Sequence, residues 1–201
     1  MTMTKKISAK DVSELRAQTG AGIMDCKRAL QETENVDKAI EFLRKKGMAS
    51  AEKRAGRTAS EGLIGSYVHF NGKVAVMVEL NCETDFVART DEFQGLANDV
   101  ALHVASMKPL AVTKEEIPQD IVEAEREVFR GQAAESGKPE HVWDKIVEGR
   151  LRKFYEEKVL LEQPFVKEDK KTVGDIVKEA SGKLGENIVV KRFVRFELGA
   201  E

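Results

Sequence analysis

The hydrophobic positions of residues 8–46 recur at the 3.6-residue spacing of amphipathic helices. Ser8 and Asp11 have the spacing of a capping box at the start of the first helix. The TGAG turn at 19–22 is expected to end that helix, and Gly47 is expected to end the third. The pattern therefore predicts a three-helix module at residues 1–47. The positions that share a face within each helix are Val12 and Leu15, then Ile23, Cys26 and Leu30, then Val36, Ala39, Ile40 and Leu43.

The pattern changes from helical to alternating after residue 61, as it does in strands. Ile64, Val68 and Phe70 fall on one side of a first strand. Asn71-Gly72 is the dipeptide typical of a type I′ hairpin turn, in which both central residues take positive φ. In the second strand, four residues alternate inward: Val74, Val76, Val78 and Leu80.

Helical spacing returns in the rest of the chain, where we expect four helices and a closing strand. The first starts near Thr90, and helices at 116–134 and 139–158 are joined by a short break that favours an antiparallel hairpin. Thr172 and Asp175 predict the start of the last helix, and Gly185 its end. The final strand, NIVVKRFVRFEL, is apolar on parts of both sides, as strands buried on both faces are.

These elements indicate the α+β class, with a small antiparallel sheet packed by helices. Three parts are expected: the three-helix module at 1–47, a charged linker helix at 48–60, and an α+β core with a dimerisation surface at 61–201. The helical hairpin, at about 116–158, is an insertion in that core.

Composition limits the classes of function. Charged residues make up 34% of the chain, but 33 Lys and Arg are balanced by 35 Asp and Glu, so there is no overall basic field to attract a nucleic-acid backbone. The apolar runs are far shorter than a membrane span, and MTMTKKISAK lacks the apolar segment of a secretory signal. We therefore expect a cytoplasmic protein with no membrane association.

We find no constellation of catalytic residues in the sequence. His69, His103 and His141 have no nucleophile motif nearby and are interpreted as structural or solvated. Cys26 and Cys82 lack partners at metal-ligand spacing and are expected to be buried. GQAAESGKP at 131–139 has the wrong glycine spacing for a phosphate-binding loop. The sequence thus predicts no catalytic residue, no metal and no cofactor.

A basic segment at 44–57 is a candidate for binding RNA phosphates. Its cations are Arg44, Lys45, Lys46, Lys53, Arg54 and Arg57. The segment has no aromatic residue for stacking on bases, and acidic residues lie close by. A solvated helical linker is the alternative, and we expect no direct nucleic-acid binding.

Phe86 raises a different question, because it lies in a connection that should be polar. If 85–93 were one continuous helix, Phe86 would share the core face with Phe93; if Thr90 begins a new helix, 85–89 is a separate exposed turn. The pattern leaves both placements open. Ile23 and Met24 pose the same question, because adjacent helical residues point to different sides and one of the two should face outward.

The motifs TGAGIMDCKRAL and NCETDFVAR, in this order, resemble the bacterial elongation factor Ts family, and the resemblance extends over essentially the whole chain. It implies a nucleotide exchange factor, without covalent chemistry, that binds the GTPase elongation factor Tu during translation. It also implies a ubiquitin-associated-like fold for the N-terminal module. The alternative is an RNA- or ribosome-associated protein acting through the 44–57 segment.

The resemblance implies the residues that contact this GTPase. Asp85 and Phe86 would reach into it, and Phe86 would separate two of its helices and disturb its Mg²⁺ and phosphate site. Thr84 and Val87 belong to the same motif. From the first motif, Ile23, Met24 and Lys27 would touch the nucleotide-binding domain.

Longer members of the family carry a duplicated core, whereas this chain has one sheet. We therefore expect a homodimer in which a second copy supplies the missing half. The final strand, around Phe193 and Phe196, is the predicted interface. From its position between two rigid elements, Phe86 is predicted to point outward.

Overall fold

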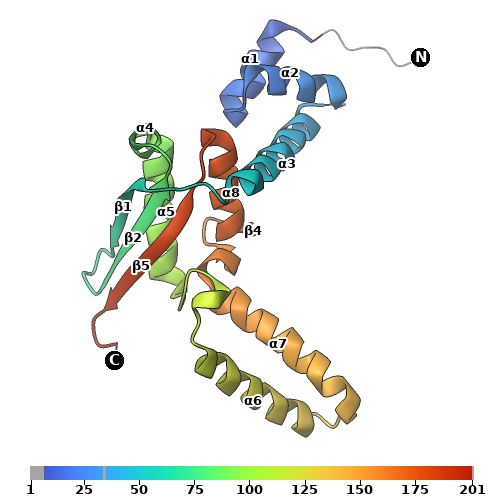
Figure 1. The fold of residues 1–201 in the computed structure, drawn as a ribbon, viewed down its shortest axis with the longest axis vertical. Helices are drawn as coiled ribbons and strands as arrows, with labels where there is room; N and C mark the ends of the chain where they lie inside the picture. The colour runs from blue at the N-terminus through green and yellow to red at the C-terminus, as the bar shows by residue number, and fades with distance from the viewer. Residues whose placement is uncertain (1–6, 34, 201) are drawn as a thin grey trace.

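The computed structural model describes residues 7–33 and 35–200 and has a C-shaped outline, with the N-terminal helices at one end and a helical hairpin at the other (Figure 1). The predicted α+β class is confirmed. The helices are α1 (Ala9–Thr19), α2 (Ile23–Glu32), α3 (Val36–Arg54), α4 (Asp85–Ala88), α5 (Asp91–Met107), α6 (Gln119–Glu135), α7 (Trp143–Lys158) and α8 (Val173–Leu184). The strands are β1 (Glu61–Val68), β2 (Val74–Cys82), β3 (Pro164–Phe165), β4 (Glu168–Thr172) and β5 (Val189–Glu197).

The N-terminal helices begin and end where local signals predict. Ser8 and Asp11 form a reciprocal capping box at the start of α1, and Gly20 ends that helix with a left-handed φ of 66°. Asn35 caps α3 by accepting a hydrogen bond from the Lys38 amide. The three helices share a small core of Val12, Leu15, Cys26, Ala29, Ala39 and Leu43.

The third helix is longer than the sequence predicts. Gly47 does not end α3, which continues as one helix to Arg54. The first part of the segment predicted as a separate linker helix at 48–60 is therefore a continuation of α3, and α3 packs along α8 of the core. Two ion pairs, Arg44–Glu179 and Glu52–Lys178, join α3 to α8.

The core is a three-stranded antiparallel sheet in the order β1-β2-β5, covered on its inner face by α5 and α8. The predicted inward alternation of β2 is confirmed: Val76, Val78 and Leu80 are buried, and Val74 packs against the same cluster. The strand ends at Cys82, two residues later than the apolar run. Strand β5 is buried on one face only within this chain, whereas both faces were expected to be covered.

The turn between β1 and β2 differs from the predicted type I′ turn. Only Gly72 has positive φ, and its amide donates to the carbonyl of His69. The His69 amide bonds to Val74, so the loop spans four residues instead of two. Such loops are built around a type I turn, which does not require Asn71 in the left-handed region.

The helical hairpin α6–α7 projects from the core (Figure 1). Its base packs around Ala111, Ile117, Phe154 and Val159. Ion pairs Arg126–Glu148 and Arg130–Asp144 join the two helices further out. The sequence did not predict the small β3–β4 hairpin that follows, because β4 is almost entirely charged and carries no apolar alternation.

A buried polar network connects α5 to the segment after the hairpin. The Nδ1 atom of His103 accepts the Val166 amide at 3.2 Å, so Nε2 carries the proton and donates to Gln163 Oε1 at 2.9 Å. The Gln163 side-chain nitrogen donates to the carbonyls of Met107 and Glu157. Within the described residues no helix is long and apolar enough to cross a membrane.

Candidate functional site

The question about Phe86 is resolved by a helix of one turn. Thr84 caps α4 by accepting the Val87 amide, and Ala88 is buried while Val87 packs partly on the core. Phe86 therefore points away from the core, and 78% of its side chain is exposed. The predicted outward placement is confirmed, although the segment is a short helix where a turn was expected.

Caps on both sides fix the orientation of α4. Thr90 begins α5 by accepting the Phe93 amide, and its hydroxyl donates to the Val87 carbonyl at 2.8 Å. The Asp85 carboxylate lies 2.7 Å from Arg89 Nη2, one turn later. The Phe86 ring is thus carried by a turn with little freedom to move.

Ile23 and Met24 form a second exposed apolar feature. They are the first two residues of α2, and their exposed fractions are 55% and 72%. Both face outward, where the sequence predicted only one. Lys27 follows one turn later and is also exposed, so this surface joins two apolar side chains to a cation.

Lys183 of α8 lies between the two features. Its side chain packs on Gly20, in the turn before α2. Its Nζ atom is 2.7 Å from Glu92 Oε1, in the first turn of α5. Figure 1 shows α4 and the N-terminal helices toward the same end of the molecule, with the end of α8 between them. Lys183 therefore connects the turn before α2 to the first turn of α5, the helix that follows α4.

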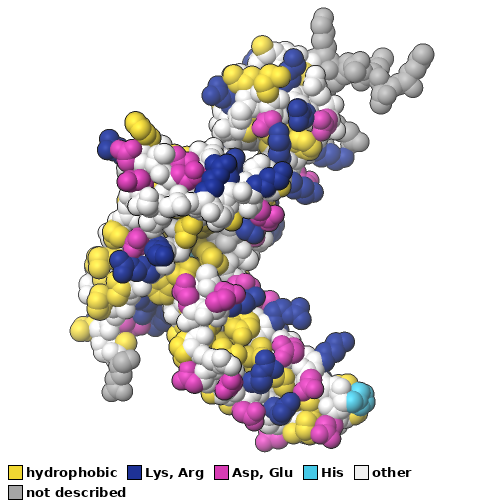
Figure 2. Space-filling model, in the orientation of Figure 1, with side chains coloured by type: hydrophobic (Ala, Val, Ile, Leu, Met, Phe, Trp, Pro, Cys, Tyr) yellow, Lys and Arg dark blue, Asp and Glu magenta, His cyan; other side chains and the backbone are white. Residues whose placement is uncertain are grey.

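The sheet carries a third apolar surface, on its outer face. The register places Met77 of β2 beside Val194 of β5, and Ala75 beside Phe196. Phe196 is 62% exposed, whereas Phe193 points to the opposite face and packs partly on the core. Figure 2 shows hydrophobic side chains gathered over the sheet. We define the outer sheet face as Ile64, Val68, Met77, Val194 and Phe196.

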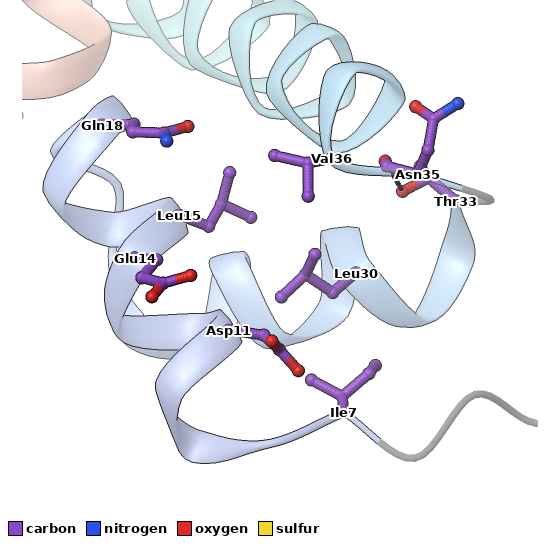
Figure 3. A pocket seen from close by; sticks show the side chains of 9 residues that line it. All are labelled: Ile7, Asp11, Glu14, Leu15, Gln18, Leu30, Thr33, Asn35 and Val36. Carbon is purple, nitrogen blue, oxygen red and sulfur yellow. Dashed lines mark hydrogen bonds between the residues drawn. The ribbon is translucent and has the colours of Figure 1, made fainter.

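Two hollows occur near the N-terminal helices, and neither contains the candidate exposed side chains. The smaller, of about 110 Å³, lies between α1, α2 and the start of α3 and is lined by Leu15, Leu30 and Val36 (Figure 3). The larger, of about 330 Å³, lies between the TGAG turn, α3 and α8. Its charged groups include Lys46, which is paired with Asp25 at 2.5 Å.

The basic segment at 44–57 is largely neutralised by carboxylates. Arg44 pairs with Glu179, Lys45 with Glu41 at 2.7 Å, and Arg57 with Glu83 at 3.5 Å. Ion pairs of this kind reduce the positive charge available to a phosphate backbone. The structure thus favours the structural helix over the RNA-binding surface.

Within residues 7–33 and 35–200, the titratable groups form no acid–base or nucleophilic site. Burial lowers the pKa of His103 and raises the pKa of the Cys82 thiol, so both remain neutral near pH 7. Both predicted buried cysteines are buried. Among the described residues, no group of three or more His, Cys, Asp or Glu side chains is placed to hold a metal ion. The arrangement is suited to binding another macromolecule through exposed apolar side chains.

Sequence reasoning missed Glu186, which is bonded to the segment that carries Phe86. It lies directly after the left-handed Gly185 that ends α8 and accepts hydrogen bonds from the Glu83 and Thr84 amides. Its partners are 102 and 103 residues away in sequence, so no local spacing marks the contact.

Comparison with known proteins gives one consistent result. The family model described as "Elongation factor TS" matches residues 4–200. A protein named elongation factor Ts from Thermosipho melanesiensis is 58% identical over 194 residues, which cover 96% of this chain and 99% of the relative. Proteins of the same name from Fervidobacterium nodosum and Carboxydothermus hydrogenoformans are each 55% identical over 96% of this chain and cover 99% and 89% of their own lengths.

Proposed function

The chain belongs to the elongation factor Ts family, the nucleotide exchange factors for elongation factor Tu, and we propose that it promotes GDP release by inserting the Phe86 side chain into that GTPase. The observation that carries this proposal is the 78% exposure of an aromatic ring on a rigidly capped turn. An exposed ring adds little to the stability of its own fold, and aromatic anchors dominate many protein interfaces. The ring would separate two helices of the GTPase beside its Mg²⁺ and phosphate site.

Exchange by this route needs no covalent chemistry. A nucleotide held with nanomolar Kd is bound by about 12 kcal/mol, and its release is slow because that bound state is deep. A factor that binds best to the conformation with a disturbed phosphate site lowers nucleotide affinity. The coupling is reciprocal, so an incoming nucleotide weakens binding of the factor by the same ratio. The factor therefore turns over without being consumed.

The second proposed contact is the surface of Ile23, Met24 and Lys27, which would bind the nucleotide-binding domain of the same GTPase. Two adjacent exposed apolar side chains at a helix start provide a second anchor, and Lys27 adds a charge that can fix orientation. Two separated contacts on one rigid frame hold the Phe86 ring in a defined direction. This activity takes place in the cytoplasm, where translation occurs.

A homodimer through the outer sheet face is the third part of the proposal. The exposed aromatic and aliphatic side chains of the outer sheet face form an apolar layer that faces water. Sheets pack face to face about 10 Å apart, and a second copy of this face would bury both layers at once. The exposed side chains of Met77, Val194 and Phe196 support this arrangement.

Release of a fluorescent GDP analogue from the matching elongation factor Tu tests the exchange proposal. Catalytic amounts of the protein should accelerate release by orders of magnitude. Phe86→Ala should lose most of this acceleration. Phe70→Ala is its matched control and should keep it, because Phe70 is 92% exposed but lies in the hairpin turn, at the opposite end of β2 from α4. Folded protein at micromolar concentration that leaves the release rate unchanged would contradict the assignment.

A further inference from the structure

Glu186 holds the two residues before α4, Glu83 and the cap residue Thr84, through three hydrogen bonds. Its Oε2 atom accepts the amides of Glu83 and Thr84, both at 3.0 Å, and its Oε1 atom accepts the Thr84 hydroxyl at 2.6 Å. The Thr84 oxygen in turn accepts the Val87 amide at 3.4 Å. The proton of the Thr84 hydroxyl is thereby directed to Glu186, which leaves an oxygen lone pair for the cap of α4.

The contact is reciprocal. While Glu186 accepts the Glu83 amide, Glu83 Oε1 accepts the Asn187 amide at 2.7 Å. The side chain of Asn187 donates to the Arg57 carbonyl at 2.7 Å, in the segment that leaves α3. Each of the two loops thus supplies a carboxylate to the backbone of the other, and charge-assisted bonds of this kind are stronger than neutral ones.

The end of α8 gives Glu186 a fixed base. The Gly185 amide closes the helix on the Ser181 carbonyl at 3.0 Å, and the Ser181 hydroxyl donates to the Glu186 carbonyl at 2.5 Å. The backbone of Glu186 is therefore held from one side while its carboxylate holds Thr84 on the other. Within the described part of the chain, no hydrogen bond or ion pair joins a side chain of α4 directly to α8.

We infer that Glu186 is a positioning residue for exchange, which acts by fixing the Thr84 cap and so the direction in which α4 presents Phe86. The inference rests on the proposed role of Phe86. The Phe86 side chain can separate two helices of the GTPase only if α4 keeps its own position when the two proteins bind. A turn that is already ordered also loses less conformational entropy on binding. The three bonds involve Glu83 and Thr84, whereas Ala88 attaches the other end of α4 to the core. The bonds therefore fix the direction of a short helix that is already packed on the core.

Two substitutions separate the effect of the length of the Glu186 side chain from the effect of its charge. Glu186→Asp keeps the charge but is one methylene shorter, so it cannot reach both the amides and the hydroxyl of Thr84. Glu186→Gln keeps the length, with its oxygen accepting the two amides and its nitrogen donating to the Thr84 oxygen. We expect Glu186→Asp and Glu186→Ala to lower factor-stimulated GDP release about tenfold, and Glu186→Gln to stay within about twofold of wild type.

A double-mutant cycle distinguishes positioning from a general structural effect. In a Phe86→Ala background, Glu186→Asp should cause no further loss, because no ring remains to be oriented. Amide hydrogen exchange at Glu83 and Thr84 should become faster in Glu186→Asp than in Glu186→Gln. Glu123→Ala, which removes an exposed carboxylate on α6, is the control for loss of one negative charge.

Several outcomes would overturn the inference: wild-type release with Glu186→Asp, equal losses with Glu186→Gln and Glu186→Ala, or equal losses from Glu186→Asp with and without Phe86. If Glu186→Ala does not fold, the comparison of Glu186→Asp with Glu186→Gln still tests the inference. Failure of the proposed function appears differently, as wild-type protein that does not accelerate release or as Phe86→Ala protein that remains fully active.

Discussion

Gly182 of α8 lies directly on the backbone of Gly47 where α8 crosses α3. A Cβ atom added to Gly182 would stand 2.8 Å from the Cα and carbonyl carbon of Gly47. A Cβ added to Gly47 would instead lie 3.7 Å from the Gly182 Cα, which is an ordinary contact distance. The absence of one side chain therefore permits the close crossing that joins the N-terminal module to the core.

This asymmetry predicts opposite effects for the two glycines. Gly182→Ala should lower the free energy of unfolding by about 1–3 kcal/mol, because the new methyl group must push two helix backbones apart. Gly47→Ala should be neutral or stabilising by up to about 1 kcal/mol, the helix propensity gained from Ala. Urea denaturation of both proteins measures the difference.

Gly131→Ala provides the control, because Gly131 lies within α6 with no atom inside 4 Å of the added Cβ. It should behave like Gly47→Ala. Equal stability of the Gly182→Ala and Gly131→Ala proteins would show that the crossing relaxes without cost. Because α3 positions Ile23 and Met24 relative to Phe86, Gly182→Ala should also weaken binding of the GTPase.

Phe86→Ala separates an interface residue from a core residue in one protein. Truncation of a central aromatic anchor costs about 2 kcal/mol or more of binding, roughly 30-fold in affinity. Truncation of a buried Phe costs about 3–5 kcal/mol of folding stability. We expect Phe86→Ala to melt within a few degrees of wild type and to lose most of its exchange activity.

Phe93→Ala is the matched comparison, because Phe93 is fully buried one helix further on. It should melt far below wild type. A similar drop in melting temperature for Phe86→Ala would mean that Phe86 belongs to the core after all, and the residue that opens the GTPase would have to be sought elsewhere.

The parts of the fold that follow from local chemistry were predictable from the sequence. The capping boxes of Ser8 and Thr172 and the left-handed glycines at 20 and 185 depend on residues within one turn. The end of α3 was not predictable from the sequence, because Gly47 lies inside the helix and faces Gly182, 135 residues later in the chain. A glycine can mark either a helix end or a close approach, and spacing alone does not distinguish them.

The candidate site was predictable only in part, because some of its features depend on neighbouring residues and others on contacts between distant parts of the chain. The pattern around Phe86 allowed a core or an exposed placement. Phe86 is exposed because Thr84 and Thr90 cap two separate helices, so that residues 85–93 are not one continuous helix. Ile23 and Met24, at the start of α2, are both exposed because the face of α2 that packs on the N-terminal core is supplied by Cys26, Ala29 and the partly buried Leu30. Glu186 could not be found, because its bonds to Thr84 form only in the folded chain.

The two phenylalanines of β5 should respond differently to Asp. Phe196→Asp places a charge on the outer sheet face and should give a monomer, because an unpaired charge in an apolar interface is strongly disfavoured. Phe193→Asp places the charge against the core and should destabilise the chain itself. Light scattering across micromolar concentrations measures the first effect and thermal melting the second.

Wild-type protein should scatter with twice the 22.4 kDa mass of the chain. A wild-type mass equal to one chain would rule out the dimer at these concentrations. A Phe196→Asp protein that remains dimeric would move the interface to another surface. In either case, the effect of Phe193→Asp on melting remains a test of which way that side chain points.

His103 makes the stability of the core sensitive to mild acid. Burial lowers its pKa below the ordinary value of 6.5, although the bond to Gln163 opposes this shift. The folded protein therefore binds fewer protons at this site than the unfolded chain does, and the free energy of unfolding falls as the pH drops below about 6.5. The decrease continues down to the lowered pKa of the folded protein, with a slope of up to about 1.4 kcal/mol per pH unit.

Urea denaturation between pH 5 and pH 8 tests this dependence in wild type and in His103→Gln, which has no titrating ring. His103→Gln should be less stable at pH 8, because the Val166 amide and Gln163 lose their shared partner. Its stability should nevertheless fall less than that of wild type between pH 7 and pH 5. The two proteins differ only at residue 103, so the difference between the two curves isolates His103. Parallel curves would show that the folded chain protonates this imidazole at the same pH as the unfolded chain does, which would require Nδ1 to release the Val166 amide.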